Sequence, residues 1–144
     1  MVMMPHRRNG PAAQRYAERR QREDEAPKLN AQVPALARLR LEIEECVGQG
    51  STKYIRTFVV DHAPALFLVP CGDPRCLDGG HDLTREVMRA LRAHEVSFRG
   101  SDNCEGAVGT SSCQRVVHFQ GTAEYHPGTA PAPGALREGT SHFR

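Results

Sequence analysis

The sequence predicts an α+β domain in which a small antiparallel sheet of about five strands carries one helix on a face. Three observations lead to this fold class. Alternating apolar and charged residues indicate strands, a short amphipathic run indicates one helix, and four cysteines lie in two pairs on either side of that run. A chain of 144 residues has room for one domain, and both of its ends are too polar to add to a core.

The first expected strands lie between residues 39 and 69. Residues 39–44 alternate apolar and charged side chains, as in a strand with one buried and one solvent-exposed face. Gly48 begins a run with turn chemistry, and residues 54–60 follow as a β-branched and aromatic strand, so the two segments form a predicted hairpin. Residues 65–69 are apolar at every position, which predicts a central strand covered on both faces.

The one expected helix begins near Asp82 and ends near His94. Asp82 is a good N-cap candidate because its carboxylate can accept a hydrogen bond from a free backbone N–H group. The apolar residues share one side of this helix and should pack on the sheet: Leu83, Val87, Ala90 and Leu91. A short strand at residues 96–98 and a final strand opened by Cys113 and running to Tyr125 complete the predicted sheet.

The chain divides into three predicted parts: a disordered basic leader at residues 1–33, the α+β domain at residues 34–126, and a flexible tail at residues 127–144. The leader has few large apolar side chains and cannot offset the entropy lost on ordering, although residues 12–25 could form a transient charged helix. The tail is rich in Pro and Gly. The net charge is +2, and the basic excess lies in the leader.

The sequence contains no apolar run as long as a membrane span, and its first residues lack the apolar stretch of a secretory signal. We therefore expect a cytoplasmic protein that makes no membrane contact. In a reducing compartment, cysteines bind metal more often than they form structural disulfides.

Four of the five cysteines form two close pairs, Cys71 with Cys76 and Cys104 with Cys113. Zinc takes four thiolates at tetrahedral corners, and two loops that each supply two thiolates meet this need. The sequence therefore predicts a four-cysteine site for Zn²⁺ that stabilises a domain whose core alone would be marginal. The layout resembles that of zinc-ribbon and zinc-knuckle proteins only in its two thiolate pairs, because four and eight residues separate the paired cysteines.

Other interpretations of the cysteines remain open. They could be buried free thiols or two local disulfides. An iron–sulfur cluster also takes four thiolates, although the tight spacings of ferredoxins are absent. A redox dithiol would favour two residues between its cysteines. Cys46 is unpaired, and we predict no role for it.

A second constellation is the Asp-Gly-Gly-His-Asp segment just before the helix. His81 is an alternative metal ligand: with Cys71 and Cys76 it could hold a metal that keeps a position open for water. Asp78 or Asp82 would then act as the base of a metal-dependent hydrolase. In the simpler interpretation the glycines form a turn, Asp82 caps the helix and His81 is a polar loop residue.

The third constellation is a stripe of arginines on the predicted helix, Arg85, Arg89 and Arg92. Guanidinium groups bind phosphates in a bidentate manner, so the stripe could contact nucleic acid, although Glu86 dilutes its charge. The chain has no phosphate-binding loop, dinucleotide glycine pattern or serine nucleophile motif.

The leading prediction for function is a small, zinc-binding, non-enzymatic binding module. Its expected partner is nucleic acid or a ribonucleoprotein, with electrostatic help from the basic leader. The alternatives are the hydrolase described above and a redox or iron–sulfur protein. The sequence does not predict the oligomeric state.

Overall fold

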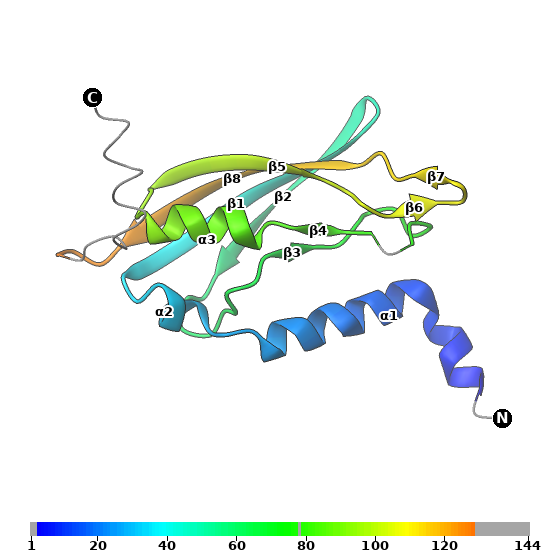
Figure 1. Ribbon diagram of the computed structural model, residues 1–144, viewed down its shortest axis with the longest axis horizontal. Coiled ribbons are helices and arrows are strands. Elements are labelled where there is room, and N and C mark those ends of the chain that lie inside the picture. Colours follow the sequence, from blue (N-terminus) through cyan, green and yellow to red (C-terminus); the bar gives the residue numbers. More distant parts are fainter. Residues whose placement is uncertain (1–2, 78, 129–144) are drawn as a thin grey trace.

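The computed structural model describes residues 3–77 and 79–128, with the backbone alone for residues 3–12 (Figure 1). The elements follow in the order α1 (Met3–Glu25), α2 (Leu29–Gln32), β1 (Leu36–Val47), β2 (Gly50–Phe58), β3 (Leu68–Val69), β4 (His81–Asp82), α3 (Thr84–Arg92), β5 (Ser97–Asn103), β6 (Ala107–Val108), β7 (Ser111–Ser112) and β8 (Val116–Tyr125).

The main sheet is antiparallel and has four strands in the order β2-β1-β8-β5. Two small sheets, β3-β4 and β6-β7, stand apart from it. The α+β class predicted from sequence is confirmed, with four strands in the main sheet in place of about five. The β1–β2 hairpin is also confirmed, and Gly48 makes its turn with a φ of 56°, a backbone conformation that favours glycine.

The prediction of a central strand at residues 65–69 is wrong. Only Leu68 and Val69 are in a strand, and they pair with β4, outside the main sheet. The run is apolar because it crosses the core beside the sheet, where Phe67 is fully buried. A short apolar run looks the same in sequence whether it lies in a sheet or packs against one.

The final strand also begins later than predicted. Strand β8 starts at Val116, and Cys113 lies in the loop that follows the β6–β7 hairpin. The apolar alternation that indicated the strand therefore begins three positions after the cysteine. Cys113 is thus placed by a loop, as the other paired cysteines are.

Helix α3 packs on the sheet through the predicted apolar side, which is buried at Leu83, Val87, Ala90 and Leu91. The N-cap position belongs to Leu83, one residue after the predicted Asp82. The Asp82 carboxylate still accepts a hydrogen bond from the Thr84 N–H group at 3.0 Å. The helix and the sheet enclose one apolar core, whose buried members include Leu39, Leu41, Ile43, Phe67, Val87, Leu91, Val117 and Phe119.

Residues 3–25, predicted to be disordered, form helix α1 in the structure. The core also begins earlier than residue 34, because Leu29 on α2 and Val33 after it are buried among its side chains. The division of the chain into leader, domain and tail is otherwise still a prediction, and residues 129–144 of the predicted tail lie outside the described residues. Among the helices described, none is long and apolar enough to cross a bilayer.

Candidate metal centre

The β3–β4 loop and the segment between β5 and β8 bring the paired cysteines together at one end of the sheet. Cys71 and Cys76 lie in the β3–β4 loop, while Cys104 directly follows β5 and Cys113 follows β7. The loops are joined by two backbone hydrogen bonds between Leu77 and Ala107, of 2.8 and 3.1 Å. Backbone pairing therefore helps to hold the two cysteine pairs side by side.

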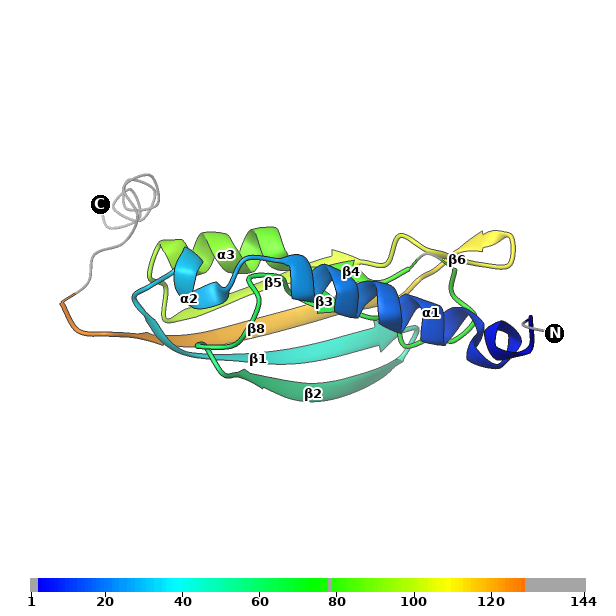
Figure 2. The ribbon, with the colours of Figure 1, turned by 90° about the horizontal axis from the view of Figure 1, so that it is seen from below.

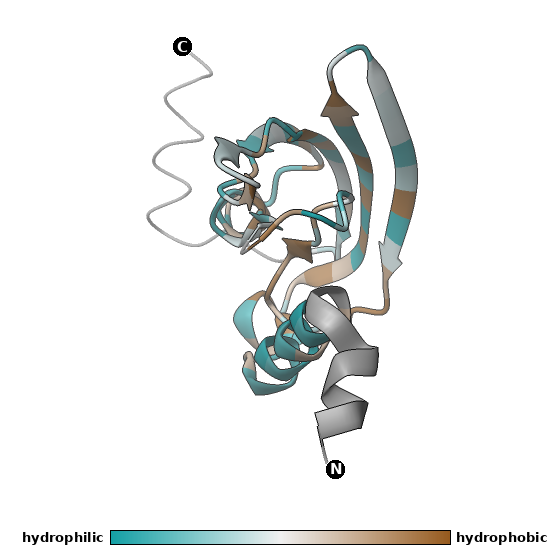
Figure 3. Ribbon diagram, turned by 90° about the vertical axis from the view of Figure 1, so that its right-hand side faces the viewer, coloured by the Kyte–Doolittle hydropathy of each residue, from teal (hydrophilic) through white to brown (hydrophobic). Residues whose placement is uncertain are grey.

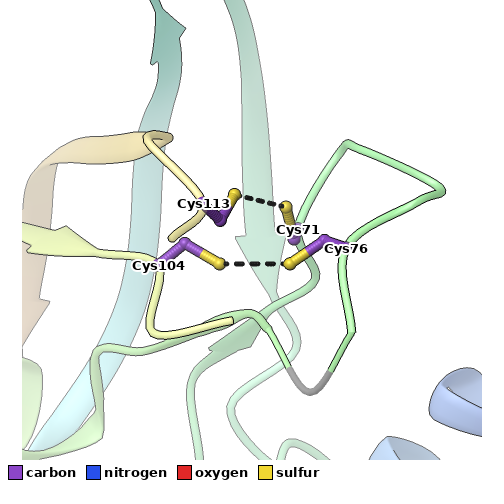
Figure 4. A group of neighbouring side chains, drawn as sticks. All are labelled: Cys71, Cys76, Cys104 and Cys113. Carbon is purple, nitrogen blue, oxygen red and sulfur yellow. Dashed lines mark hydrogen bonds between the residues drawn. The ribbon is translucent and has the colours of Figure 1, made fainter. Parts of the chain in front are cut away.

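The four sulfur atoms lie within 4.8 Å of one another, and all four cysteines are buried (Figure 4). Sulfur–sulfur contacts join one loop to the other, at 3.7 Å between Cys71 and Cys113 and at 3.6 Å between Cys76 and Cys104. These distances are far longer than a disulfide bond of about 2.05 Å. Four sulfurs placed tetrahedrally about 2.3 Å from one ion would be about 3.8 Å apart. The four thiols are thus spaced so that they could hold one metal ion.

Two glycines let the backbone approach these sulfurs closely. A Cβ atom at Gly79 would overlap the Cys76 sulfur and lie 2.7 Å from the Cys104 sulfur. A Cβ atom at Gly106 would lie 2.5 Å from the Cys76 sulfur and 2.6 Å from the Gly79 Cα atom. Any side chain at either position would push the loops apart, so the compact sulfur group depends on glycine at both.

Backbone N–H groups donate hydrogen bonds to the sulfurs. The Cys104 sulfur accepts from Gly80 at 3.4 Å and from Gly106 at 3.5 Å, and the Cys71 sulfur accepts from Asp73 at 3.5 Å. Such donors stabilise a thiolate, which is the form that binds metal.

The pKa values of these thiols follow from burial and from the N–H donors. Burial is the main cause that raises the pKa of Cys71 to about 11, and burial likewise raises the pKa of Cys76. Burial also acts to raise the pKa of Cys104, but the N–H groups of Gly106 and Gly80, together with neighbouring sulfurs, outweigh it and lower that pKa. Without a cation, at least two of the thiols therefore stay protonated at neutral pH. A bound divalent ion would stabilise the thiolate form that burial disfavours.

A buried carboxylate ties both loops to the main sheet. Glu45 of β1 is 9% exposed, and its two oxygens accept from the Arg115 guanidinium at 3.1 Å and from the Gly72 N–H group at 2.8 Å. The Arg115 carbonyl in turn accepts from the N–H group of Cys104 at 3.0 Å. No motif in the sequence singles out this contact, although Glu45 continues the inward-facing positions of Leu41 and Ile43 and is predictable from that alternation.

His81, the alternative ligand, lies outside the sulfur group. Among residues 3–77 and 79–128, the only cluster of possible ligands comprises the four cysteines. The His81 ring is fully buried, with Nδ1 at 3.2 Å from the Asp102 carboxylate and Nε2 without a hydrogen-bond partner. The structure does not group His81 with Cys71 and Cys76 as the hydrolase hypothesis requires. Asp78, one of its two candidate bases, lies outside the described residues.

The remaining candidates lie elsewhere. Arg85, Arg89 and Arg92 are exposed on α3, at the far end of the sheet from the β6–β7 hairpin (Figure 1). Their contact with phosphate is still a prediction. Cys46 is half-buried opposite Ser51 in the β1–β2 pairing and does not belong to the group of four sulfurs.

Comparisons with protein-family models, curated proteins and solved structures give no match. The chemistry of the site itself therefore has to carry the functional argument.

Proposed function

We propose that this protein is a small zinc-binding module, in which Cys71, Cys76, Cys104 and Cys113 bind one structural Zn²⁺, and that it binds nucleic acid or a ribonucleoprotein. The observation that carries the metal proposal is the group of four buried sulfurs within 4.8 Å of one another. A tetrahedral set of four thiolates suits zinc or iron. An iron–sulfur cluster would place several irons and sulfides between its cysteines and needs a wider shell of sulfurs.

A structural role is favoured over a catalytic one by the number of thiolates. Catalytic zinc keeps one position for water or substrate, whereas four thiolates fill all four positions. The loops that carry the cysteines are rich in Gly, with Pro and Asp in the first and Ser in the second, so they can bury little apolar surface by themselves. Metal binding would supply the stabilisation that such loops lack.

The nucleic-acid partner is supported by the kind and place of the charges. Lys28 and Lys53 are the only lysines, so nearly all of the basic side chains are arginines. Arginine presents a planar fork that matches phosphate oxygens. Several of these arginines lie on the surfaces of α1 and α3.

Native mass spectrometry and metal analysis of protein purified without added metal test the site. We expect one zinc ion per chain and free thiols. In the Cys104→Ser variant the ion should be lost, while Cys46→Ser, a matched cysteine control outside the site, should retain it. Two disulfides and no ion in the unmodified protein would overturn the metal proposal.

A filter-binding titration over a salt series tests the partner. Binding through phosphates releases counterions, so affinity for RNA or DNA should fall steeply as salt rises. No binding to either polymer, or an affinity that is unchanged by salt, would refute the nucleic-acid part and leave the metal proposal standing.

A further inference from the structure

A groove separates helix α1 from the β3–β4 sheet and the first cysteine loop. It encloses about 780 Å³, within the range of about 300–1,000 Å³ typical of ligand sites. Figures 1 and 2 both show α1 running alongside β3 and β4. One wall comes from α1, and the other from the loops around Cys71 and Gly79.

The groove exists because α1 has no apolar face with which to fill it. None of the described side chains of the helix, residues 13–25, is buried, and the helix is predominantly hydrophilic (Figure 3). Polar contacts hold it in place: the Arg15 guanidinium donates to the Cys76 carbonyl at 2.6 Å, and Arg22 lies 3.7 Å from the Asp82 carboxylate. A helix held in this way leaves its inner side available to a ligand.

The α1 wall has a net positive charge, because three arginines line it with one carboxylate, Glu18; Arg19 also lies 3.7 Å from the Glu23 carboxylate. Arg15, Arg19 and Arg22 line the groove at steps of four and three residues, so they share one side of the helix over about 10 Å. The buried Arg15 Nε atom has no hydrogen-bond partner. The side chains of the Arg22–Asp82 ion pair are 59% and 51% exposed to solvent. Little stability is therefore lost when a phosphate replaces the Asp82 carboxylate.

The groove also offers a surface on which a base can stack. Tyr16 lines it and is 53% exposed, and the Arg19 guanidinium lies 5.2 Å from the centre of its ring. Pro70 and Pro74 line the opposite wall. Stacking on an aromatic ring accepts any base and is typical of proteins that bind single strands.

The acidic groups of the groove set the orientation of the ligand. Asp82, Asp102 and Glu105 lie on the wall opposite α1, where they repel phosphate, whereas Glu18 lies on α1 itself. Asp102 has His81 as its partner, whereas Asp82 loses Arg22 when that arginine contacts a phosphate. The phosphates would therefore face α1, and the bases would face the prolines.

We infer that this groove binds a single-stranded nucleic-acid segment, with its phosphates on the arginines of α1 and a base on Tyr16. The inference rests on the proposed function and locates nucleic-acid binding in the groove beside α1. A groove of this volume admits a nucleotide or two and excludes a duplex. The arginine stripe of α3 is then not the principal contact.

Filter binding of a labelled 12-nucleotide single strand, and of its duplex, tests the inference in full-length, metal-loaded protein. The Arg19→Ala/Arg22→Ala variant should weaken single-strand binding at least about tenfold and make the salt slope about 1.4 smaller, since each lost phosphate contact removes about 0.7. Tyr16→Leu should weaken binding roughly 5- to 100-fold with an unchanged salt slope, because stacking releases no counterion.

Arg38→Ala/Arg40→Ala is the matched control, because it removes the same charge from the outer face of the sheet, and it should bind as the unmodified protein does. Arg85→Ala/Arg89→Ala on α3 is the competing arm. If this variant loses binding and the α1 variant does not, or if the duplex binds better than the single strand, the inference is wrong and the proposed function stands. If the unmodified protein binds neither polymer, both fail. Circular dichroism and metal content verify that each variant is folded.

Discussion

The two ends of the main sheet are stabilised by different chemistry. Under α3, the strands bury aliphatic and aromatic side chains in one continuous core. At the other end, four cysteine sulfurs form a separate buried cluster, with Val108 as the partly buried apolar residue packed against it. Burying an apolar side chain such as Leu or Val contributes about 1.5–3 kcal/mol, and many such residues share the first end. The second end has few such residues, so we expect its stability to depend on the ion proposed above.

The largest effect is expected from removing a cysteine. In Cys76→Ser, metal affinity should be lost and the cysteine loops should unfold, because structural zinc supplies about 10–16 kcal/mol in small domains. We expect hydrogen exchange to show lost protection in residues 70–80 and 104–115 and retained protection in α3. Cys46→Ser should change neither. If α3 loses its hydrogen-exchange protection together with the loops, the two ends of the sheet unfold as one cooperative unit and are not stabilised separately.

A cavity in the apolar core should destabilise the fold without affecting the metal site. Leu41 is fully buried, so Leu41→Ala should lower the free energy of unfolding by about 2–5 kcal/mol. Urea denaturation measures this loss, and metal analysis of the native variant should still find one ion per chain. A variant that remains folded but has lost its ion would show that the core also sets the sulfur geometry.

A smaller effect is expected from adding a side chain where the backbone lies close to the sulfurs. Gly79→Ala introduces a Cβ atom against two sulfur atoms, and overpacking of this kind costs about 1–3 kcal/mol. We expect weaker retention of metal against a competing chelator. Gly50→Ala is the control, since its nearest neighbour is a carbonyl oxygen at 3.8 Å and its φ is not in the left-handed region. Equal metal retention in the two variants would contradict the role assigned to Gly79.

The last prediction is a pH dependence of stability whose direction differs between the metal-free and the metal-bound protein. In metal-free protein, the pKa of Cys71 is raised from 9.0 to about 11 in the folded state. The Cys71 thiol therefore keeps its proton to a higher pH in the folded state than in the unfolded state. Its contribution to the free energy of unfolding is complete below pH 9 and is lost as the pH rises through 11. With metal bound, thiolates are the ligands, so acid should release the ion. Thermal unfolding of both forms between about pH 5 and pH 11 checks the two directions.

Local patterns predicted the elements that depend on neighbouring residues. The β1–β2 hairpin follows from alternation before Gly48 and from β-branched and aromatic residues after it. The buried side of α3 follows from the spacing of Val87, Ala90 and Leu91. The prediction of a sheet strand at residues 65–69 was wrong because an apolar run indicates burial and does not show whether the segment belongs to the sheet. The extent of α1 was missed for a related reason, since a charged segment without an apolar face has no periodic signal of a packed helix.

The sequence by itself determined the α+β class, the hairpin, the packed side of α3 and the set of four paired cysteines, because each depends on residue type and on short spacings along the chain. Only the tertiary structure decided that Cys71 meets Cys113 and Cys76 meets Cys104, that Glu45 joins both loops to β1, and that α1 leaves a groove beside them. These contacts join segments far apart in the chain. Their geometry is set by strand order and by the approach of two glycine-containing loops, which no local pattern encodes.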